Sequence, residues 1–461
     1  MTDIAIIGGG AAGAAVFGEL LRRLGRDDSV HWITGSDAPG RGVAYATDDP
    51  RHVLNVRAAG MSLMAQPADA FLRHVEHNLD GVTGTDFLPR GVFGDFVQAQ
   101  IRTAMEAART KGPHVAVHAH RATAVHRDVD GGYRLVHGQD AVLKIDALVL
   151  AVGALPARPM RNVSSAALGS GAYVLDPWCR DEPSHAPRKV LVIGTGLTAV
   201  DTLISAATRW PRAELVAVSR HGCLPFAHAV QPLAPYPFQN DLNTSLLACD
   251  GPLAVLHHIR AAVDAAPDVH WHAIIDGMRP VNARLWQAFS PAQRRRFLRH
   301  LRWLWESVRH RAAPAPFATV QALLDSGRLE VRAARVLAVD GNGPLQVMLR
   351  ERRSGREDTL QADRVVQATG LDTAVGDAGD PLLSQMLRDG LVKPDALQLG
   401  LAAGTDGCLH DADGRPQATL LALGALLRGT LWECTAMPEI RLAAANLGQM
   451  LAQWHPGQGD S

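Results

Sequence analysis

The stretch Lys189–Leu203, KVLVIGTGLTAVDTL, has the pattern of a buried strand, a glycine-containing turn and the first turns of a helix. The same pattern occurs near the N-terminus, at Asp3–Gly25, in DIAIIGGGAAGAAVFGELLRRLG. A strand, a glycine turn and a helix in this order form the unit that holds a dinucleotide pyrophosphate at the N-terminus of the helix. The sequence therefore predicts two dinucleotide sites in one chain.

The stretches that follow the two glycine turns also repeat. Each predicts three short strands around a central turn, DGG in the first copy and DGNG in the second, and each ends in an apolar strand. Asp146 and Asp363 precede these apolar strands, and Gly153 and Gly370 follow them. We therefore predict an α/β fold with two Rossmann-like dinucleotide-binding domains.

The composition is that of a globular protein without a charge bias. Among 461 residues, 46 Lys and Arg balance 46 Asp and Glu, so the net charge does not point to nucleic acid or an anionic membrane as a partner. No apolar run approaches the ~20 residues that a membrane-spanning helix needs. Asp3 also stands where a signal peptide would carry basic residues. We expect a cytoplasmic protein.

The cysteines are spaced too widely for a redox-active dithiol. They are Cys179, Cys223, Cys249, Cys408 and Cys434. Because no two of them form a CxxC or CxxxxC pair, the sequence argues against a disulfide reductase. His270 and His272 form an HxH pair on a predicted strand. No third ligand follows at a metal-binding spacing, so we expect no metal site.

The first glycine turn, GGGAAG, contains the complete GxGxxG pattern. Gly8 permits the tight turn, Gly10 lets a pyrophosphate approach the backbone, and Gly13 lets the helix pack closely on the strand. The next predicted strand, VHWIT, ends at Thr34 instead of the acidic residue that usually binds the adenosine ribose. We expect the hydroxyl of Thr34, or Asp37 in the following loop, to make this contact.

The segment after this strand holds further candidate site residues. Gly40 and Gly42 allow a second close approach of the backbone. Asn55 lies inside an apolar run, HVLNVRAAGM, where a buried carboxamide needs hydrogen-bond partners from a local turn or from a bound group. Arg90, in FLPRGVFGDF, is either a surface arginine or another polar residue of the site.

The second glycine turn, GTGLTAVD, departs from the pattern at one position. Gly194 and Gly196 keep the first two roles, and Thr198 is a third candidate contact. Ala199 replaces the last glycine and adds one methyl group where the helix meets the strand. The next strand ends at Arg220, where an NAD site would carry an acid, and an arginine there accommodates the 2′-phosphate of NADPH. We expect NAD(P)H with a mild preference for NADPH, unless Arg220 is only an exposed charge.

A different region, 224–325, lies within the second copy. It begins with a proline-rich segment and then becomes helical, with one long helix predicted from Ser290 and Pro291 onward. The predicted buried face of this helix consists of Phe297, Leu301, Leu304 and Val308. A final helix is predicted at Pro438–Leu451. We expect the region 224–325 to form a lid or wall over a substrate.

Several segments together resemble the FAD/NAD(P)-binding flavoproteins. They are the opening GxGxxG, GRGVAYATDDPRHVLNV, FLPRGVFGDF, VLVIGTGLTAVD, ATG and GTLWECTAMPEIR. The chain is most similar to bacterial flavoproteins that include a urate hydroxylase lineage distinct from the hydroxybenzoate-hydroxylase type. It is more distantly similar to flavin monooxygenases with two dinucleotide-binding domains, including the N-hydroxylating ones. The resemblance covers nearly the whole chain.

The resemblance implies a domain organisation. A discontinuous FAD-binding domain would comprise residues 1–160 and 371–461, with its pyrophosphate at the first glycine turn. An NAD(P)H-binding domain, 186–223 and 326–370, would be inserted into it, and residues 224–325 would form the helical insertion.

The resemblance also bears on two candidate flavin contacts. Related flavoproteins often end a C-terminal strand in Gly-Asp, whose carboxylate contacts the ribityl chain. Here Ala425 follows Gly424, so a backbone group or another residue must make this contact. Asn55 is the candidate residue beside the flavin.

By this resemblance, we expect a monooxygenase that uses FAD, NAD(P)H and O2 to hydroxylate a small polar molecule. Urate or a related nitrogen heterocycle is the first expected substrate, and N-hydroxylation of an amino acid or amine is the alternative. An NAD(P)H:acceptor oxidoreductase that supplies a partner protein and a flavin-binding protein without catalysis are the remaining possibilities. In each enzymatic case the cofactor supplies the redox chemistry, and the protein binds and orients it.

Overall fold

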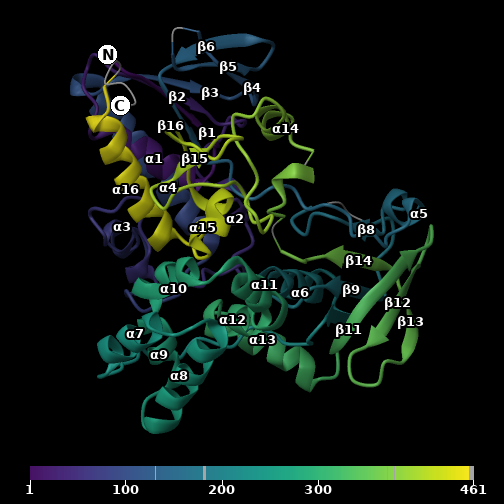
Figure 1. The fold of residues 1–461 in the computed structure, drawn as a ribbon. Coiled ribbons are helices and arrows are strands. Elements are labelled where there is room, and N and C mark those ends of the chain that lie inside the picture. Colours follow the sequence, from purple (N-terminus) through teal and green to yellow (C-terminus); the bar gives the residue numbers. More distant parts are fainter. Residues whose placement is uncertain (130, 180–182, 371, 378, 456–461) are drawn as a thin grey trace.

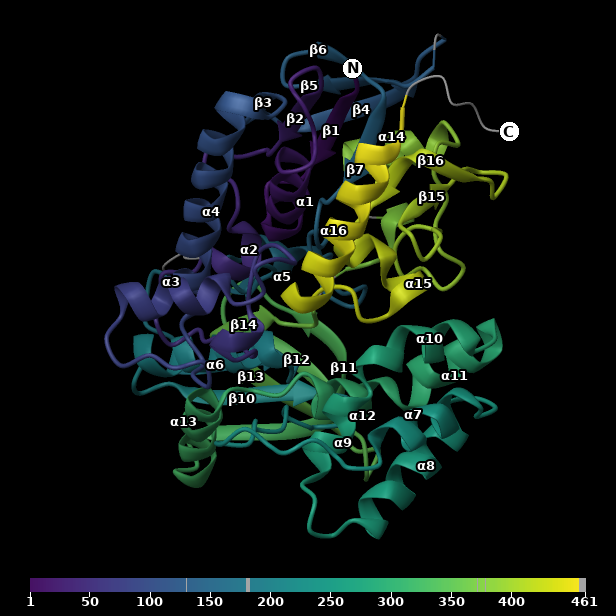
Figure 2. The same ribbon diagram turned by 90° about the vertical axis from the view of Figure 1, so that its left-hand side faces the viewer.

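The computed structural model describes residues 1–129, 131–179, 183–370, 372–377 and 379–455. Two main sheets, each with parallel and antiparallel strands, form two separate layers. In each sheet, the glycine turn of one repeat follows the end of an inner strand, β1 or β9. Figures 1 and 2 show the first sheet and the helices around it, here called the first unit, above. The second sheet and the helices of the insertion lie side by side beneath it.

The first sheet has six strands in the order β15-β16-β7-β1-β2-β3. Its strands are β1 (Asp3–Ile7), β2 (Ser29–Ile33), β3 (His114–His118), β7 (Ala147–Leu150), β15 (Cys408–His410) and β16 (Pro416–Ala422). All neighbours run parallel except β15 and β16. Because β16 pairs with β7, residues far along the chain complete the sheet that the N-terminus begins.

Helices cover this sheet on the side shown in Figure 2. The central one is α1 (Ala11–Leu21), with α4 (Arg90–Lys111) on one side and α16 (Met437–Gln453) on the other. The smaller helices of this unit are α2 (Gly42–Tyr45), α3 (Ala70–Asn78), α14 (Pro381–Arg388) and α15 (Arg428–Leu431). The predicted C-terminal helix is therefore present, with one or two more residues at each end.

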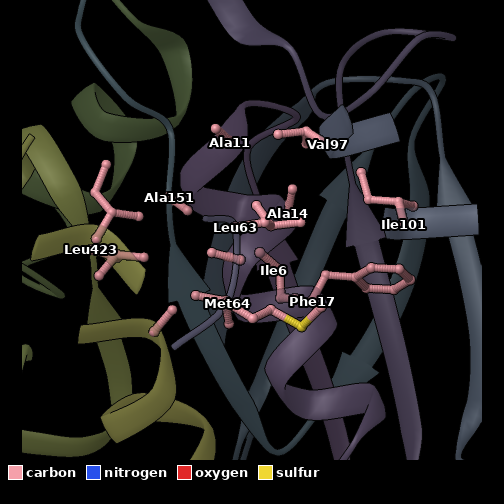
Figure 3. Close-up of a cluster of buried hydrophobic side chains, with 14 of the residues drawn as sticks. Ile6, Ala11, Ala14, Phe17, Leu63, Met64, Val97, Ile101, Ala151 and Leu423 are labelled. Atoms are coloured by element: carbon pink, nitrogen blue, oxygen red, sulfur yellow. The ribbon is translucent and has the colours of Figure 1, made fainter. Parts of the chain in front are cut away.

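The core of the first unit lies between the sheet and these helices. Figure 3 shows Ile6 of β1 and Phe17 of α1 among side chains from distant segments, including Met64 and Val97. Phe17 also stacks on Trp32 of β2 with ring centroids 4.6 Å apart, and both rings are fully buried. Burial of large aromatic side chains contributes most of the stability of such a core.

The second sheet has seven strands in the order β13-β12-β11-β10-β9-β14-β8. They are β8 (Tyr173–Val174), β9 (Lys189–Ile193), β10 (Glu214–Ser219), β11 (Leu329–Asp340), β12 (Leu345–Glu351), β13 (Glu357–Ala362) and β14 (Arg364–Gln367). Helix α6 (Leu197–Arg209) follows β9 and packs against α13 (Pro314–Asp325). A short helix, α5 (Ser165–Gly169), precedes β8.

The two repeats place their hairpin strands differently. In the first copy, β4 (Ala122–Arg127), β5 (Tyr133–His137) and β6 (Ala141–Ile145) form a separate three-stranded sheet. In the second copy, β11 is long enough to pair with β10 and to continue into the antiparallel hairpin with β12, so the corresponding strands join the main sheet. The strands were predictable from the sequence in both copies, but their sheet membership was not.

The two repeated aspartates have the same structural role. The carboxylate of Asp146 accepts a hydrogen bond of 2.8 Å from the backbone N–H of Asp3. The carboxylate of Asp363 accepts hydrogen bonds of 2.7 and 2.9 Å from the backbone N–H groups of Arg188 and Lys189. In each repeat the aspartate therefore connects the start of the first strand to the start of the last one and satisfies a backbone N–H there.

In the described residues, the helical insertion contains six α-helices before α13. They are α7 (Gln239–Leu247), α8 (Pro252–Ala265), α9 (Trp271–Gly277), α10 (Asn282–Ala288), α11 (Pro291–His300) and α12 (Arg302–Arg309). The predicted start at Ser290 is confirmed by a capping box with Gln293, but the predicted single helix breaks at Leu301. The prediction that His270 and His272 lie on a strand is wrong, since they begin α9.

No helix in the described ranges combines the length and the apolar character that a membrane crossing requires.

Candidate functional site

The first glycine of each turn is required by the backbone. Gly8 has φ +132°, and a Cβ atom there would lie 2.1 Å from the carbonyl oxygen of Ala151. Gly194 has φ +126°, and its Cβ would lie 2.1 Å from the carbonyl oxygen of Ala368. The two turns therefore cross the ends of β7 and β14 with nearly the same geometry, and only glycine fits.

The third position of each turn depends on the neighbouring strand. A Cβ on Gly13 would lie 2.0 Å from the Gly8 oxygen and 3.2 Å from Nε1 of Trp32, whose indole N–H donates to that oxygen at 2.9 Å. The residue of the second copy that matches Trp32 in register is Ala217. The methyl group of Ala199 is fully buried in the same apolar cluster as Ala217.

The second glycine of each turn opens the helix N-terminus. Gly10 and Gly196 are the N-cap residues of α1 and α6, and neither helix has a side-chain cap. A Cβ on Gly196 would meet nothing within 4 Å, and a Cβ on Gly10 would lie 3.7 Å from the Cα of Gly42. The first N–H groups of α1 and α6 are thus left open by the glycines, and we call these two helix N-termini, at Gly10 and Gly196, the first and the second cradle. Unpaired N–H groups at a helix N-terminus are suited to bind a pyrophosphate.

The Thr34 hydroxyl donates to backbone oxygens near the end of β2. Thr34 is buried, and its hydroxyl lies 2.7 Å from the carbonyl oxygen of Ser36 and 3.0 Å from that of His118. Because the hydroxyl already has these backbone acceptors, the expected ribose contact by Thr34 has no support from the geometry. Ser36 and Asp37 are exposed in the same loop, so a ribose contact by Asp37 stays a prediction.

The other predicted glycines also adopt conformations that favour glycine. Gly40 has φ +107° and packs against α4, and Gly42 has φ +57° beside Gly10. Gly153 and Gly370 have φ values of +74° and +89° and face open space after the last strand of each repeat.

Gly424 lies beside the first glycine turn. It has φ +78°, and its Cβ would lie 3.9 Å from the Cβ of Ala12 in the first turn of α1. The segment that lacks the usual aspartate is therefore next to the first cradle, where a backbone contact to the ribityl chain stays a prediction.

Two arginines lie at the end of β10. Arg220 is exposed, and its carbonyl oxygen accepts a hydrogen bond of 3.2 Å from Nη1 of Arg352, in the turn between β12 and β13. Arg352 also lies 3.4 Å from Nε2 of His221. Burial, Arg352 and Arg220 together lower the pKa of His221, so the local potential is positive. Sequence spacing gave no signal for Arg352, because a long hairpin brings it here.

Arg90 is not a surface arginine. Its guanidinium lies 2.8 Å from the carboxylate of Asp201 in α6, and its Nε donates to the Val53 oxygen at 3.2 Å. The Asp201 side chain is 4% exposed and the Arg90 side chain 16%. Asp201, which the sequence left without a role, therefore joins the second cradle to the first unit.

A second polar contact lies beside this ion pair. Nε2 of His52 lies 2.8 Å from the hydroxyl of Ser205 in α6, and its Nδ1 lies 2.7 Å from the hydroxyl of Thr47. Burial lowers the pKa of His52, so the imidazole is neutral and acts through hydrogen bonds. These contacts hold α6, and with it the second cradle, in a fixed position relative to the first unit.

Asn55 lies where the first unit meets the insertion. Its carbonyl oxygen is 3.0 Å from Nε2 of His228, and its side chain is half-buried. In the part of the chain that the structure describes, no hydrogen bond to the Asn55 carboxamide is found, so the expected local turn contact is not formed. Its placement beside a flavin stays a prediction.

The insertion also contacts the segment before α16. Glu433 accepts hydrogen bonds from Asn282 and Trp305 at 3.0 and 3.1 Å. Trp432 has φ +61°, which is unusual for a bulky side chain, and its ring stacks on Trp286 of α10 with centroids 4.8 Å apart. The insertion therefore fixes the loop that leads to the N-terminus of α16. Within the described ranges, no three His, Cys, Asp or Glu side chains are arranged as metal ligands.

Substitutions at Gly194 and Gly196 should have different effects. For Gly194→Ala we expect the free energy of unfolding to fall by roughly 1–3 kcal/mol or more, because the alanine is strained and meets the Ala368 oxygen. Gly196→Ala should leave the unfolding free energy within about 0.5 kcal/mol of wild type. It should raise the KM for NADPH, because the methyl group points into the open cradle. Thermal unfolding and steady-state kinetics measure both; an unchanged KM in Gly196→Ala would show that no phosphate lies there.

The two arginines at β10 should distinguish NADPH from NADH. Arg220→Ala and Arg352→Ala should each raise the KM for NADPH by about tenfold, which corresponds to the loss of one charge-assisted contact. The KM for NADH should stay the same, because NADH has no 2′-phosphate. Arg350→Ala is the matched control, since Arg350 is on the same hairpin and pairs with Glu357. Equal changes for both cofactors would contradict a 2′-phosphate contact.

The Asp201 carboxyl should make stability depend on pH. Burial raises the pKa of Asp201 from 3.8 in the unfolded chain to about 6 in the folded protein, although the positive charge of Arg90 acts in the opposite direction. The folded protein then binds the proton more tightly, so this stabilisation is complete below about pH 4 and is lost as the pH rises through about 6.

Relative to Asp201→Asn, the wild type should therefore lose Tm across this pH window. Differential scanning calorimetry at a series of pH values measures the difference, with Asp268→Asn at an exposed carboxylate as control. A difference in Tm that does not vary with pH would refute the raised pKa.

Comparison with known proteins adds the family context. A family described as FAD-NAD(P)-binding matches residues 5–155. An L-ornithine N(5)-monooxygenase from Burkholderia cepacia is 27% identical over 286 residues, which cover 59% of this chain and 56% of that protein. The match thus spans about half the length of this relative.

Solved structures match over nearly the whole chain. The ornithine hydroxylase PvdA from Pseudomonas aeruginosa has a TM-score of 0.65 and 16% identity, covering 98% of this chain and 99% of its own. The ornithine N-hydroxylase KtzI from Kutzneria sp. 744, solved with reduced FAD, NADP+ and L-ornithine, has a TM-score of 0.64, with the same identity and coverage. Thioredoxin reductase from T. acidophilum has a TM-score of 0.53 and 11% identity, covering 98% of each chain.

The family match agrees with the expected FAD- and NAD(P)-binding flavoprotein. The monooxygenases named here are ornithine hydroxylases, so they resemble the N-hydroxylating alternative and not the urate hydroxylases expected first. The protein has the α/β fold with two dinucleotide-binding domains that N-hydroxylating flavin monooxygenases share with thioredoxin reductase.

Proposed function

We propose that this protein is an FAD-dependent monooxygenase that uses NAD(P)H and O2 to hydroxylate the nitrogen of a small amine or amino acid. The observation that carries the proposal is the match of nearly the whole chain, insertion included, to two ornithine hydroxylases. The repeated glycine turns add independent support, since both are open to a pyrophosphate.

Each of the two cradles would bind one cofactor. FAD would lie at Gly10 and NAD(P)H at Gly196, with Arg220 and Arg352 beside the 2′-phosphate of NADPH. When bound, FAD supplies hydride acceptance and the activation of O2. The Arg90–Asp201 ion pair joins α6 to the first unit and would hold the two cofactors at a fixed distance and orientation. A fixed geometry matters because hydride transfer needs the reacting atoms close together and aligned.

The insertion would keep water from the reaction. Helices α10 and α12 contact Trp432 and Glu433, in the loop that leads to α16. In flavin monooxygenases the reactive site must exclude water, because an unprotected intermediate releases peroxide. We infer that this helical layer closes the flavin site and forms part of the substrate pocket.

A disulfide reductase shares the fold but needs a reactive dithiol. Cys408 and Cys434 are both buried, and burial raises the pKa of each thiol to about 12. Such thiols are inert as nucleophiles near neutral pH. Together with the absence of CxxC spacing in the sequence, this favours the monooxygenase over the reductase.

NADPH oxidation by the FAD-loaded protein tests the proposal. We expect an amine substrate to raise the oxidation rate and to direct most of the electrons into a hydroxylamine instead of hydrogen peroxide. L-Ornithine, L-lysine, putrescine and cadaverine are suitable amines, and urate is the matched control. Mass spectrometry with isotopically labelled O2 identifies the transferred oxygen atom. Stoichiometric peroxide with every amine, or turnover that continues without O2, would refute the assignment and favour an oxidase or an electron carrier.

A further inference from the structure

An apolar cavity of about 300 Å³ lies within the helical insertion, among α8, α11 and α12. Trp286 of α10 and Trp432, which stack on each other, form a further wall. In Figures 1 and 2, α8 lies on the side of the insertion that faces away from the first unit. Among the described residues, the lining includes no part of either glycine turn, so the cavity is separate from both cradles.

The apolar side chains around this cavity are only half covered by the protein. Within α11 and α12, both of which the structure describes in full, no side chain is fully buried. An apolar stripe at helical spacing normally packs against a core, and incomplete burial forgoes part of its stabilisation. A ligand in the cavity could reach this stripe, because its members are half-buried and all belong to the lining: Phe297, Leu301, Leu304 and Val308.

Three polar groups in the cavity wall are already paired within the protein. The indole N–H groups of Trp286 and Trp305 donate to the Gly429 oxygen at 2.7 Å and to Glu433 at 3.1 Å. Nδ2 of Asn282 donates to Glu433 at 3.0 Å. Because these groups have partners, a ligand inside the cavity would gain its binding energy mainly from apolar contacts.

Charged residues mark the side of the cavity that opens to solvent. Arg260 and Asp264 of α8 belong to the lining, and both are exposed. The exposed Lys, Arg, Asp and Glu side chains of α8 and α11 are Asp264 and four arginines, namely Arg260, Arg295, Arg296 and Arg299. This excess of positive charge attracts an anionic group to the rim of the cavity.

The size of the cavity favours a small molecule. An apolar cavity of about 150 Å³ in another protein stays free of water and binds benzene. By that measure, a cavity of about 300 Å³ would hold roughly ten carbon atoms in a flexible chain. Small-molecule pockets begin at about this volume. A protein partner would need about 800 Å² of surface on each side, with few charges at its centre.

We propose that this cavity binds a medium-chain alkyl carboxylate, with its chain against the apolar face of α11 and α12 and its carboxylate beside Arg260. Burial of the chain supplies most of the affinity. The carboxylate stays at the exposed rim, where the guanidinium can donate to it and neither charge has to leave water. This site lies beyond the proposed function, because binding there requires neither NAD(P)H nor an amine.

Calorimetric titration of the FAD-loaded protein with carboxylates of different length tests the chain. Butanoate, hexanoate, octanoate, decanoate and tetradecanoate are compared, each below its micelle concentration. We expect saturable binding of decanoate, with a Kd that falls about fourfold for each added methylene group. The gain should level off beyond decanoate, because further carbons lie outside the cavity. Tryptophan fluorescence should change with the same Kd, since four tryptophans line the cavity, namely Trp271, Trp286, Trp305 and Trp432.

Filling the cavity should remove this binding. Ile259→Trp on α8 and Leu304→Trp on α12 each place a larger ring in the space, from two different walls. We expect each to weaken decanoate binding by about tenfold or more, while Tm stays the same or rises because apolar area is buried. Leu253→Trp is the matched control, since this residue of α8 is exposed and outside the lining. It should keep the wild-type affinity.

Arg260→Gln tests the head group. It should weaken decanoate binding about threefold, as the loss of an exposed ion pair implies, and leave the binding of decanol unchanged. Arg284→Gln, at an exposed arginine of α10 outside the lining, is the matched control and should change neither affinity. Decylamine should bind more weakly than decanoate. Decylamine that binds as tightly, or decanoate binding that Arg260→Gln leaves unchanged, would overturn the carboxylate assignment.

Two results would overturn the site itself. One is the absence of saturable decanoate binding by calorimetry and fluorescence, and the other is undiminished binding in both filled variants. Sedimentation velocity covers a second copy of the chain as the occupant. A dimer that both filled variants abolish and Leu253→Trp retains would replace the ligand and overturn the proposal. Because no measurement follows turnover, these results do not depend on whether the protein forms a hydroxylamine.

Discussion

The crossing of a glycine turn over a neighbouring strand is the constraint on which both cradles depend. In each repeat the first glycine lies so close to the carbonyl group that follows the last strand that any side chain would collide with it. This contact sets the direction in which the helix leaves the sheet, and so places its free N–H groups at the edge of the sheet. The aspartates Asp146 and Asp363 hold the other end of the same two strands together.

Contacts between the units hold the two cradles in a fixed relative position. Arg90 pairs with Asp201, and His52 bonds to Ser205, so residues from the first unit hold α6 directly. These groups are largely buried, so they interact in a medium of lower polarity than water and are costly to separate. The helical insertion adds a second constraint, because Trp286 and Trp305 contact the loop before α16. The position of α6 and that of the loop before α16 thus depend on different contacts with the rest of the chain.

The two neighbouring cavities of the insertion differ in chemistry. One, of about 280 Å³, contains the guanidiniums of Arg57 and Arg311 and a single carboxylate, that of Asp276. Another, of about 300 Å³, lies among α8, α11 and α12 and is lined mainly by apolar side chains such as Ile259, Leu304 and Val308. The predicted apolar face of the helix after Ser290 faces this second space, and the break at Leu301 bends the helix around it. The same insertion therefore borders a cavity with excess positive charge and a hydrophobic one.

The sequence by itself determined the two dinucleotide units, their strands and the positions that must be glycine. These follow from local patterns, because hydrophobic periodicity and the conformational freedom of glycine act over a few residues. Only the tertiary structure decided which polar residues meet. The Thr34 hydroxyl donates to the Ser36 oxygen in its own loop, Arg90 pairs with Asp201, and Arg352 lies beside Arg220 although it comes from a distant hairpin. Such contacts depend on how sheets and helices pack in three dimensions, and spacing along the chain carries no record of that arrangement.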